Sequence, residues 1–265
     1  KLDPPSRNRF RPPQYFDDGH CLAAVCYTGV VFANEREKMN FEGKVVLVTG
    51  STTGIGEACA RAFSAAGASI MITGRNVERG EQVRDDLLRQ GRAAAFVQAD
   101  IRSDGVCERL VTETVEHFER LDVLVNNAGI FYSANALETT DEQWRDTFDV
   151  NVDALFFLSR AAVRQMLKQH GGCIVNVASE WGLNGENGHV AYCASKGAVV
   201  QITRCMALDH AADGIRVNSV CPGETHTQMM DDILKQKGDD FEESLRDLAR
   251  GIPMGRIASP AEVAR

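Results

Sequence analysis

The sequence KVVLVTGSTTGIG occupies positions Lys44–Gly56 and joins an apolar run to a glycine-rich turn. The run Lys44–Thr49 has the length and the β-branched content of a buried strand. Apolar residues then recur at helical spacing over Gly54–Ala66, so the turn leads directly into a helix. Its glycines allow a tight turn and a close approach to a phosphate group, and the helix N-terminus offers unpaired N–H groups and a positive dipole end. The alternative is a glycine turn that serves only close packing, because the spacing GxxxGxG differs from the common dinucleotide pattern GxGxxG.

The rest of the chain alternates short apolar runs with amphipathic segments of helical length. The expected strands are Lys44–Thr49, Ser69–Thr73, Ala93–Ala99, Leu121–Asn126, Cys173–Ala178 and Ile215–Val220. The expected helices are Gly54–Ala66, Asn76–Gln90, Asp104–Glu119, Asp141–Gln169 and His189–Ala212. Continuous apolar strands separated by helices predict a parallel sheet covered on both faces, and right-handed crossovers make it a doubly wound α/β fold of the Rossmann type. The sequence has no internal repeat and no Gly/Ser linker, so we expect a single domain over residues 41–265.

Length and composition limit the class of protein to which the chain belongs. Its 265 residues suffice for one large α/β domain, and 44% hydrophobic with 25% charged residues is ordinary for a soluble globular enzyme. A net charge of −8 argues against a nucleic-acid partner, and no apolar run reaches the roughly 20 residues that span a membrane. None of the eight cysteines forms a CxxC pair, so no metal site is expected, and their scatter fits a reducing compartment.

Residues 1–40 are interpreted as a disordered or non-native extension. Four prolines and several arginines before position 20 are typical of disorder. The apolar run Cys21–Ala33 also fits a signal peptide. The sequence favours a natural start at Met39, just before the first strand, with residues 1–38 as a leader of no structural role. That interpretation predicts a cytoplasmic protein, while organellar or secretory targeting by residues 1–38 stays open.

Residues 224–250 lack a strand pattern. They predict two short amphipathic helices, Asp231–Lys237 and Phe241–Arg250, which follow the end of the sixth strand. Ligands of open α/β sheets bind at the strand C-termini, so this position suits a lid over the site. The alternative is a surface insertion.

Five motifs in order resemble those of the short-chain dehydrogenase/reductase family. The matching residues are Thr49–Gly56 (TGxxxGxG), Asn126–Gly129 (NNAG), Asn151, Ser179 with Tyr192 and Lys196 (YxxxK), and Pro222–Gly223 with Thr227 (PGxxxT). The resemblance runs from about Lys44 to the last residue. It implies an oxidoreductase that transfers hydride between a nicotinamide and a carbonyl or secondary alcohol, similar to 3-oxoacyl-acyl-carrier-protein reductases. The alternative is a nucleotide-binding relative without activity.

Tyr192 and Lys196 are four residues apart on an expected helix, so they share a face. A free tyrosine has a pKa of about 10, too high for ready proton exchange near neutrality. We expect the nearby ammonium to stabilise the phenolate and lower that pKa. The resemblance implies that Lys196 also binds the nicotinamide ribose.

Two further residues complete the expected catalytic set. Ser179 ends the fifth strand, where its hydroxyl is expected to hydrogen-bond the substrate oxygen. Asn151 lies within an expected helix, for which asparagine has mediocre propensity. The resemblance implies that Asn151 holds a water molecule that links Lys196 to solvent. Trp181 is expected either to wall the substrate pocket or to pack the loop.

The second strand ends in Thr73-Gly74-Arg75, where dinucleotide folds usually carry an acid that binds the ribose hydroxyls. A guanidinium pairs with a 2′-phosphate, so the sequence predicts NADP(H) over NAD(H), with a solvated surface arginine as the alternative. Asp100 and Ile101 resemble the family's adenine-contacting pair. The residues expected to bind the cofactor are Gly50, Ser51, Thr52, Gly54, Ile55, Gly56, Arg75, Asp100, Ile101, Asn127, Ala128, Gly129, Tyr192, Lys196, Pro222, Gly223, Thr225 and Thr227.

The resemblance also bears on assembly. Trp144, Phe148, Phe156 and Phe157 lie on a helix that packs between subunits in the family, which implies a homodimer or homotetramer, with intramolecular packing as the alternative. The family continues beyond the position of Arg265 with a helix and a seventh strand. We therefore expect the chain to be a fragment that retains every catalytic residue but lacks the last strand of the family.

Overall fold

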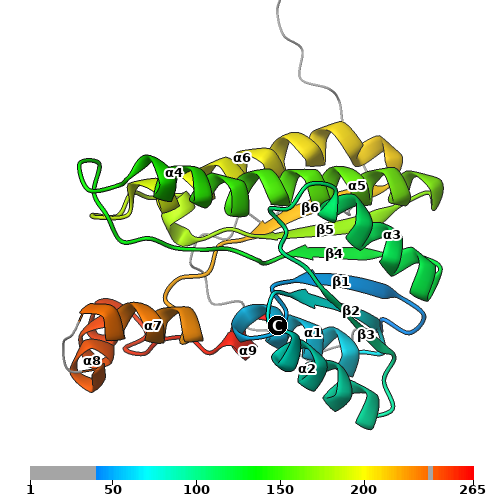
Figure 1. Ribbon diagram of the computed structural model, residues 1–265, viewed down its shortest axis with the longest axis horizontal. Coiled ribbons are helices and arrows are strands. Elements are labelled where there is room, and N and C mark those ends of the chain that lie inside the picture. The colour runs from blue at the N-terminus through cyan, green and yellow to red at the C-terminus, as the bar shows by residue number, and fades with distance from the viewer. Residues whose placement is uncertain (1–39, 238–240) are drawn as a thin grey trace, which may run out of the picture. The chain divides into compact units, whose positions relative to one another are not determined.

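The fold is built on a parallel sheet (Figure 1). The computed structural model describes residues 40–237 and 241–265, which belong to the larger of the two units into which the chain divides, Ala33–Arg265. The strands are β1 (Val45–Thr49), β2 (Ser69–Gly74), β3 (Ala94–Gln98), β4 (Val123–Asn126), β5 (Gly172–Val177) and β6 (Ile215–Val220). Their order is β3-β2-β1-β4-β5-β6, and all neighbours are parallel. The doubly wound fold predicted from the sequence is confirmed.

Helices cover both faces of this sheet. They include α1 (Gly54–Ala65), α2 (Val77–Arg89), α3 (Val106–Phe118), α5 (Ala154–Lys168) and α6 (Val190–His210). Alternate residues of β1 serve the two faces: Val46 and Val48 pack with α1 and α2, whereas Leu47 packs with α3 and α5. All of β1 is buried, which explains why its sequence is a continuous apolar run rather than an alternating one.

The prediction of one continuous helix over Asp141–Gln169 is wrong in the middle of that range. The structure has α4 (Asp141–Phe148), then one π-helical turn, η1 (Asp149–Asp153), and then α5. Thr140 caps α4 with a capping box, which sets its start. The apolar spacing alone did not reveal the π turn, because one wide turn inside a helix barely changes the pattern. Such turns occur frequently at functional sites, and this one contains Asn151.

The region after β6 carries the two helices expected there. These are α7 (Gln228–Lys237), which begins three residues before its predicted start, and α8 (Phe241–Gly251), followed by a short helix α9 (Pro260–Val263) that the sequence analysis did not predict. Thr225 forms an isolated parallel bridge with Ala258, and the His226 N–H donates to the Ala258 carbonyl at 2.9 Å. The segment before α7 is therefore attached to the segment after α8, and α9 contacts α1.

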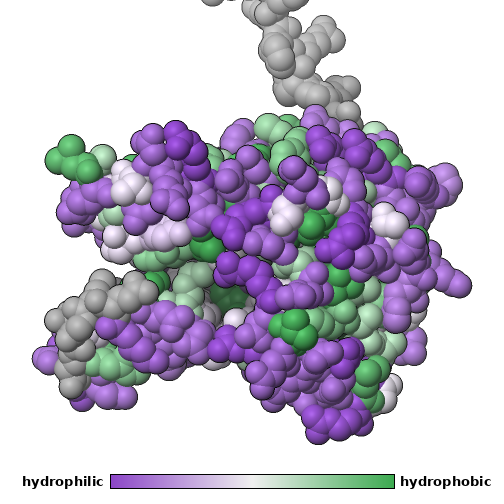
Figure 2. Space-filling model, in the orientation of Figure 1, coloured by the Kyte–Doolittle hydropathy of each residue, from purple (hydrophilic) through white to green (hydrophobic). Residues whose placement is uncertain are grey.

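Residues 1–39 of the predicted N-terminal extension lie outside the described residues. Within residues 40–237 and 241–265, no helix has the length and apolar character needed to cross a membrane. Figure 2 shows that the face drawn there is hollowed between the side of the molecule that carries α4 and α6 and the side that carries α7 and α8.

Candidate active site

The strand order reverses between β1 and β4, and two predicted motifs meet there. Such switch points are where open α/β sheets bind ligands. The Asn127 side-chain amide donates to the Thr49 carbonyl at 2.9 Å, and the Thr49 hydroxyl accepts from the backbone N–H groups of Asn127 and Ala128. A Cβ on Gly56 would lie 2.4 Å from both the Asn127 amide and the Gly50 carbonyl. The glycine turn is therefore packed against the loop after β4, so these glycines serve packing as well as access.

The open face of the turn fits a phosphate group. Gly54 has φ of +60°, and a Cβ there would meet only the Thr227 side chain, at 3.5 Å. Thr53 precedes α1 but makes no side-chain cap, so the side chain of Thr53 does not satisfy the first N–H groups of the helix. The motif that contains Thr227 thus faces the motif that begins α1. These residues fit the pyrophosphate of a dinucleotide, which accepts hydrogen bonds at helix N-termini.

Not every predicted cofactor residue offers its side chain to a ligand. Ser51 is fully buried, and its hydroxyl donates to the Val48 carbonyl at 2.7 Å and accepts from the Thr73 N–H at 3.0 Å. The side chains of Ser51 and Asn127 therefore hold the turn on the sheet. Any contact that Ser51 makes with a cofactor uses its backbone.

Ser179 and Tyr192 come together at the C-terminal end of β5. Ser179 is buried, and its hydroxyl accepts the Trp181 N–H at 3.2 Å, which begins the short 3₁₀ turn η2 (Glu180–Gly182). Tyr192 lies on the first turn of α6, half-buried, and is hydrogen-bonded to Ser179. Burial raises the pKa of Tyr192 to about 12, and the hydrogen bond with Ser179 opposes this rise. The pKa shift is opposite to the one expected from the sequence.

The burial of Lys196 explains why its positive charge does not lower the pKa of Tyr192. Its ammonium lies 5.6 Å from the centroid of the Tyr192 ring and donates to the Val177 carbonyl at 2.8 Å. The side chain is buried, and burial lowers the pKa of Lys196 to about 8. The predicted pairing of cation and phenol on one helix face is present, but desolvation is the largest influence on the pKa of each group.

Asn151 is brought to the same place by the π turn η1. Its carboxamide oxygen accepts the Ile130 N–H at 2.8 Å, and its amide nitrogen donates to the Ile130 carbonyl and to the Ser195 hydroxyl, both at 3.0 Å. A Cβ on Gly129 would lie 3.2 Å from the Asn151 oxygen and 3.5 Å from the Lys196 nitrogen. Asn151 therefore fixes the loop after β4 beside Lys196. Both amide hydrogens of Asn151 are used by protein groups, so the implied water would have to bind an oxygen of Asn151 rather than its amide nitrogen.

The predicted adenine end lies at the ends of β2 and β3. Arg75 is exposed, and its charge helps to lower the pKa of the Asp100 carboxyl, after the larger effect of the hydrogen bonds from Arg102. Arg102 bridges Asp100 and Asp146, with contacts of 2.6 Å to each. Arg75 itself makes no ion pair within the described residues. Ile101 is half-buried against the core.

An aromatic wall surrounds Tyr192, and only part of it was expected from the sequence. Phe131 lies 5.0 Å from the Tyr192 ring and 6.0 Å from Trp181, and Trp181 stacks on His189 at 4.7 Å. Trp181 was expected to be either a wall or loop packing, and His189 was not predicted as a site residue. The signal for Phe131 was available, since it comes two residues after the NNAG motif. Ser195, which accepts from Asn151, had no comparable signal.

A polar ladder behind the site was also missed. The Asn126 amide donates to Asn176 at 2.9 Å across the β4–β5 register, and Asn176 donates to the Thr203 hydroxyl on α6 at 2.9 Å. All three side chains are buried. The ladder connects the strand that leads to NNAG, the strand that leads to Ser179 and the helix that carries Tyr192, so it fixes their relative positions.

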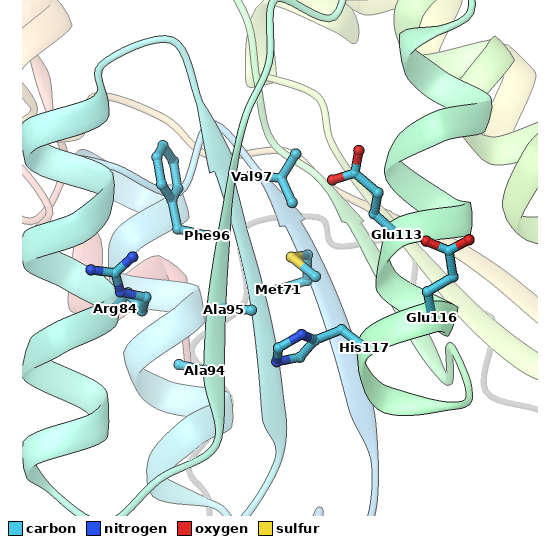
Figure 3. Close-up of a pocket in the computed structure, with 9 residues that line it drawn as sticks. All are labelled: Met71, Arg84, Ala94, Ala95, Phe96, Val97, Glu113, Glu116 and His117. Carbon is cyan, nitrogen blue, oxygen red and sulfur yellow. The ribbon is translucent and has the colours of Figure 1, made fainter.

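A separate groove lies away from these residues. It has a volume of about 480 Å³ at the β3 edge of the sheet, where Figure 3 shows Arg84 on one side and His117, Glu113 and Glu116 on the other. None of the predicted site residues lines it. The predicted catalytic residues therefore lie at the strand ends and not in this groove.

Comparisons with known proteins agree with this geometry. A family model described as short chain dehydrogenase matches residues 44–238. The chain is 43% identical to the meso-2,3-butanediol dehydrogenase of Serratia marcescens over 85% of this chain and 86% of that protein. It is 40% identical to the cyclopentanol dehydrogenase of Comamonas sp. (strain NCIMB 9872), over 84% and 87%. A crystal structure of an actinorhodin polyketide ketoreductase variant with NADPH superposes with a TM-score of 0.80 at 35% identity, over 83% of this chain and 87% of that one.

The chain belongs to the short-chain dehydrogenase family. The resemblance identified in the sequence is thus confirmed. The protein is an NAD(P)-dependent oxidoreductase that acts on CH–OH groups.

Proposed function

We propose that this protein interconverts a small secondary alcohol and its ketone with NADP(H), and that Tyr192 exchanges the proton. The hydrogen bond between Ser179 and Tyr192 beside buried Lys196 carries the proposal, because it brings a proton donor and an oxyanion-stabilising hydroxyl to one point. Relatives named for butanediol and cyclopentanol support a compact alcohol as substrate.

The roles follow from the contacts. A bound nicotinamide supplies hydride to the carbonyl carbon or accepts it from the alcohol. Ser179 donates a hydrogen bond to the substrate oxygen, and Tyr192, which is protonated at neutral pH, gives its proton to that oxygen during reduction. Lys196 binds the ribose and, with Asn151, connects Tyr192 to solvent.

The direct test is a turnover assay that follows cofactor absorbance. We expect the purified protein to oxidise 2-butanol or cyclopentanol with NADP⁺ and to reduce the matching ketones with NADPH. Cofactor binding without turnover of any alcohol or ketone would favour the alternative, a nucleotide-binding relative without activity. Equal or better kcat/KM with NAD⁺ would contradict the choice of cofactor.

Arg75 is proposed to bind the 2′-phosphate of NADP(H). It follows β2, where no carboxylate stands, and Arg102 already neutralises the two nearest acids, Asp100 and Asp146. Arg75→Ala is expected to raise the Kd of NADPH about 10-fold, the effect of a lost charge-assisted contact, with little change for NADH. Titration of both cofactors by fluorescence measures this. Arg79→Ala, which removes an exposed arginine from α2, serves as the control.

A second copy of the chain is proposed to cover α4 and α5. Trp144, Phe156 and Phe157 there are 41%, 39% and 40% exposed, so each leaves apolar surface for a second copy to cover. We expect an oligomer in light scattering and a lower mass for Phe157→Asp. Leu88→Asp, on α2 against the opposite sheet face, introduces the same charge as a control. A wild-type monomer would contradict the proposal.

A further inference from the structure

Glu180 is fixed between two parts of the site. It follows Ser179 directly, and its backbone N–H donates to the Pro222 carbonyl at 3.0 Å. The turn that it begins packs closely on α6, because a Cβ on Gly182 would lie 2.7 Å from the backbone carbonyl carbon of Lys196. The backbone of Glu180 therefore has little freedom, and its carboxylate occupies a defined place at the strand ends.

The Glu180 carboxylate has no partner of its own. It is half-buried, and within the described part of the chain it makes neither a hydrogen bond nor an ion pair. Both of its oxygens lie 3.2 Å from the point that a Cβ on Gly223 would occupy, so the carboxylate lies close against this glycine. Burial raises the pKa of Glu180, and the charge of Glu186 acts in the same direction. A partly desolvated carboxylate without a donor is unfavourable, and a ligand that brings a donor relieves this.

The surroundings define which ligand brings that donor. Ser179 and Tyr192 hold the reacting oxygen in the proposed function, and Glu180 is adjacent to Ser179 in the chain. Phe131 and Trp181 form the apolar part of the wall. A substrate held by Ser179 thus meets this apolar wall, and Glu180, the next residue of the chain, carries a carboxylate at the same strand end.

We propose that Glu180 selects substrates with a second hydroxyl beside the reacting carbon, the class of vicinal diols and α-hydroxyketones. The carboxylate accepts a hydrogen bond from that hydroxyl, and no bond at Glu180 is made or broken. This assignment rests on the proposed function, since it concerns the substrate of that reaction. Glu180 is a specificity residue, whereas Tyr192 remains the proton donor.

The test compares two alcohols that differ by one hydroxyl, 2,3-butanediol and 2-butanol. Glu180→Leu removes the acceptor, and Glu180→Gln keeps an oxygen but loses the charge. We expect kcat/KM for 2,3-butanediol to fall about 10- to 100-fold in Glu180→Leu, as for a lost hydrogen bond to a charged group, and less in Glu180→Gln. For 2-butanol and for NADP⁺, kcat/KM and KM are expected to stay within about twofold.

Glu116→Gln is the matched control, because it removes one exposed carboxylate from α3, away from the site. It is expected to leave both alcohols unaffected. Equal losses with 2,3-butanediol and 2-butanol, or no loss with either, would overturn the assignment of Glu180. If the wild type oxidises neither alcohol with either cofactor, the proposed function itself is overturned, and the Glu180 assignment falls with it.

Discussion

Tyr192→Phe is expected to lower kcat by about 1,000-fold while leaving the affinity for NADPH nearly unchanged, because the substitution removes the proton donor and keeps the ring. The ring contributes the contacts with Phe131 and Trp181, at 5.0 and 6.0 Å, so the wall should persist. The measurement is steady-state reduction of a ketone, together with a fluorescence titration of NADPH. A loss in kcat without a loss in cofactor binding distinguishes chemistry from misfolding.

Tyr132→Phe gives the matched control for this experiment. Its hydroxyl donates to Asp146 at 2.7 Å rather than to Ser179, so the same atom is removed elsewhere. We expect kcat of this variant to stay within about threefold of wild type. If Tyr192→Phe retained more than about one-tenth of wild-type kcat, another group would have to supply the proton.

The pattern of residues predicted which elements meet, because parallel strands all end at one edge of the sheet. Ser179 follows a strand that the hydrophobic periodicity defined, and Tyr192 and Lys196 lie on the next helix, so all three were expected near the same strand end. Strand boundaries also agreed to within two residues, since continuous apolar runs end where the chain leaves the core. The sequence placed Gly50–Gly56 after the first strand, and the structure shows that the strand order reverses there, between β1 and β4.

The sequence did not predict features that depend on surroundings. The pKa of Tyr192 depends on how far its hydroxyl is desolvated, and the four-residue spacing to Lys196 says nothing of that. The π turn around Asn151 leaves the apolar periodicity almost intact, so it was missed. The Glu180 carboxylate lies close against Gly223, which is distant in the chain, and no sequence pattern points from one to the other.

Desolvation also determines what Lys196 does to stability. The side chain is 4% exposed, and within the described residues no carboxylate pairs with its ammonium, so the fold holds a buried charge with one neutral acceptor, the Val177 carbonyl. Burial lowers the pKa of Lys196 from 10.5 to about 8. A buried, unpaired charge destabilises a fold, and residues of this kind are retained for function rather than for stability.

The sign of the pH dependence follows from this pKa. Below about pH 8 lysine is protonated in both the folded and the unfolded chain, and the full penalty of the buried charge applies. Between pH 8 and 10.5 the unfolded chain binds more protons than the folded one, so stability rises with pH. A shift from 10.5 to about 8 corresponds to a gain on the order of 3 kcal/mol across this window.

Lys196→Met is therefore expected to lower kcat about 100-fold or more and to remove this pH dependence. At neutral pH the two proteins should be of similar stability, because loss of the buried charge is offset by an unsatisfied Val177 carbonyl that costs about 1–3 kcal/mol. The wild type should then become the more stable protein as pH rises, since its lysine turns neutral while the variant does not change. Urea unfolding at several pH values between 7 and 10 measures the difference. The contributions of titrating groups that both proteins share cancel in this difference. Lys168→Met, which removes an exposed lysine from α5, is the control, and its stability is expected to follow that of the wild type at every pH. Parallel profiles for Lys196→Met would show that Lys196 is not held as a buried cation, and its proposed role in connecting Tyr192 to solvent would need another explanation.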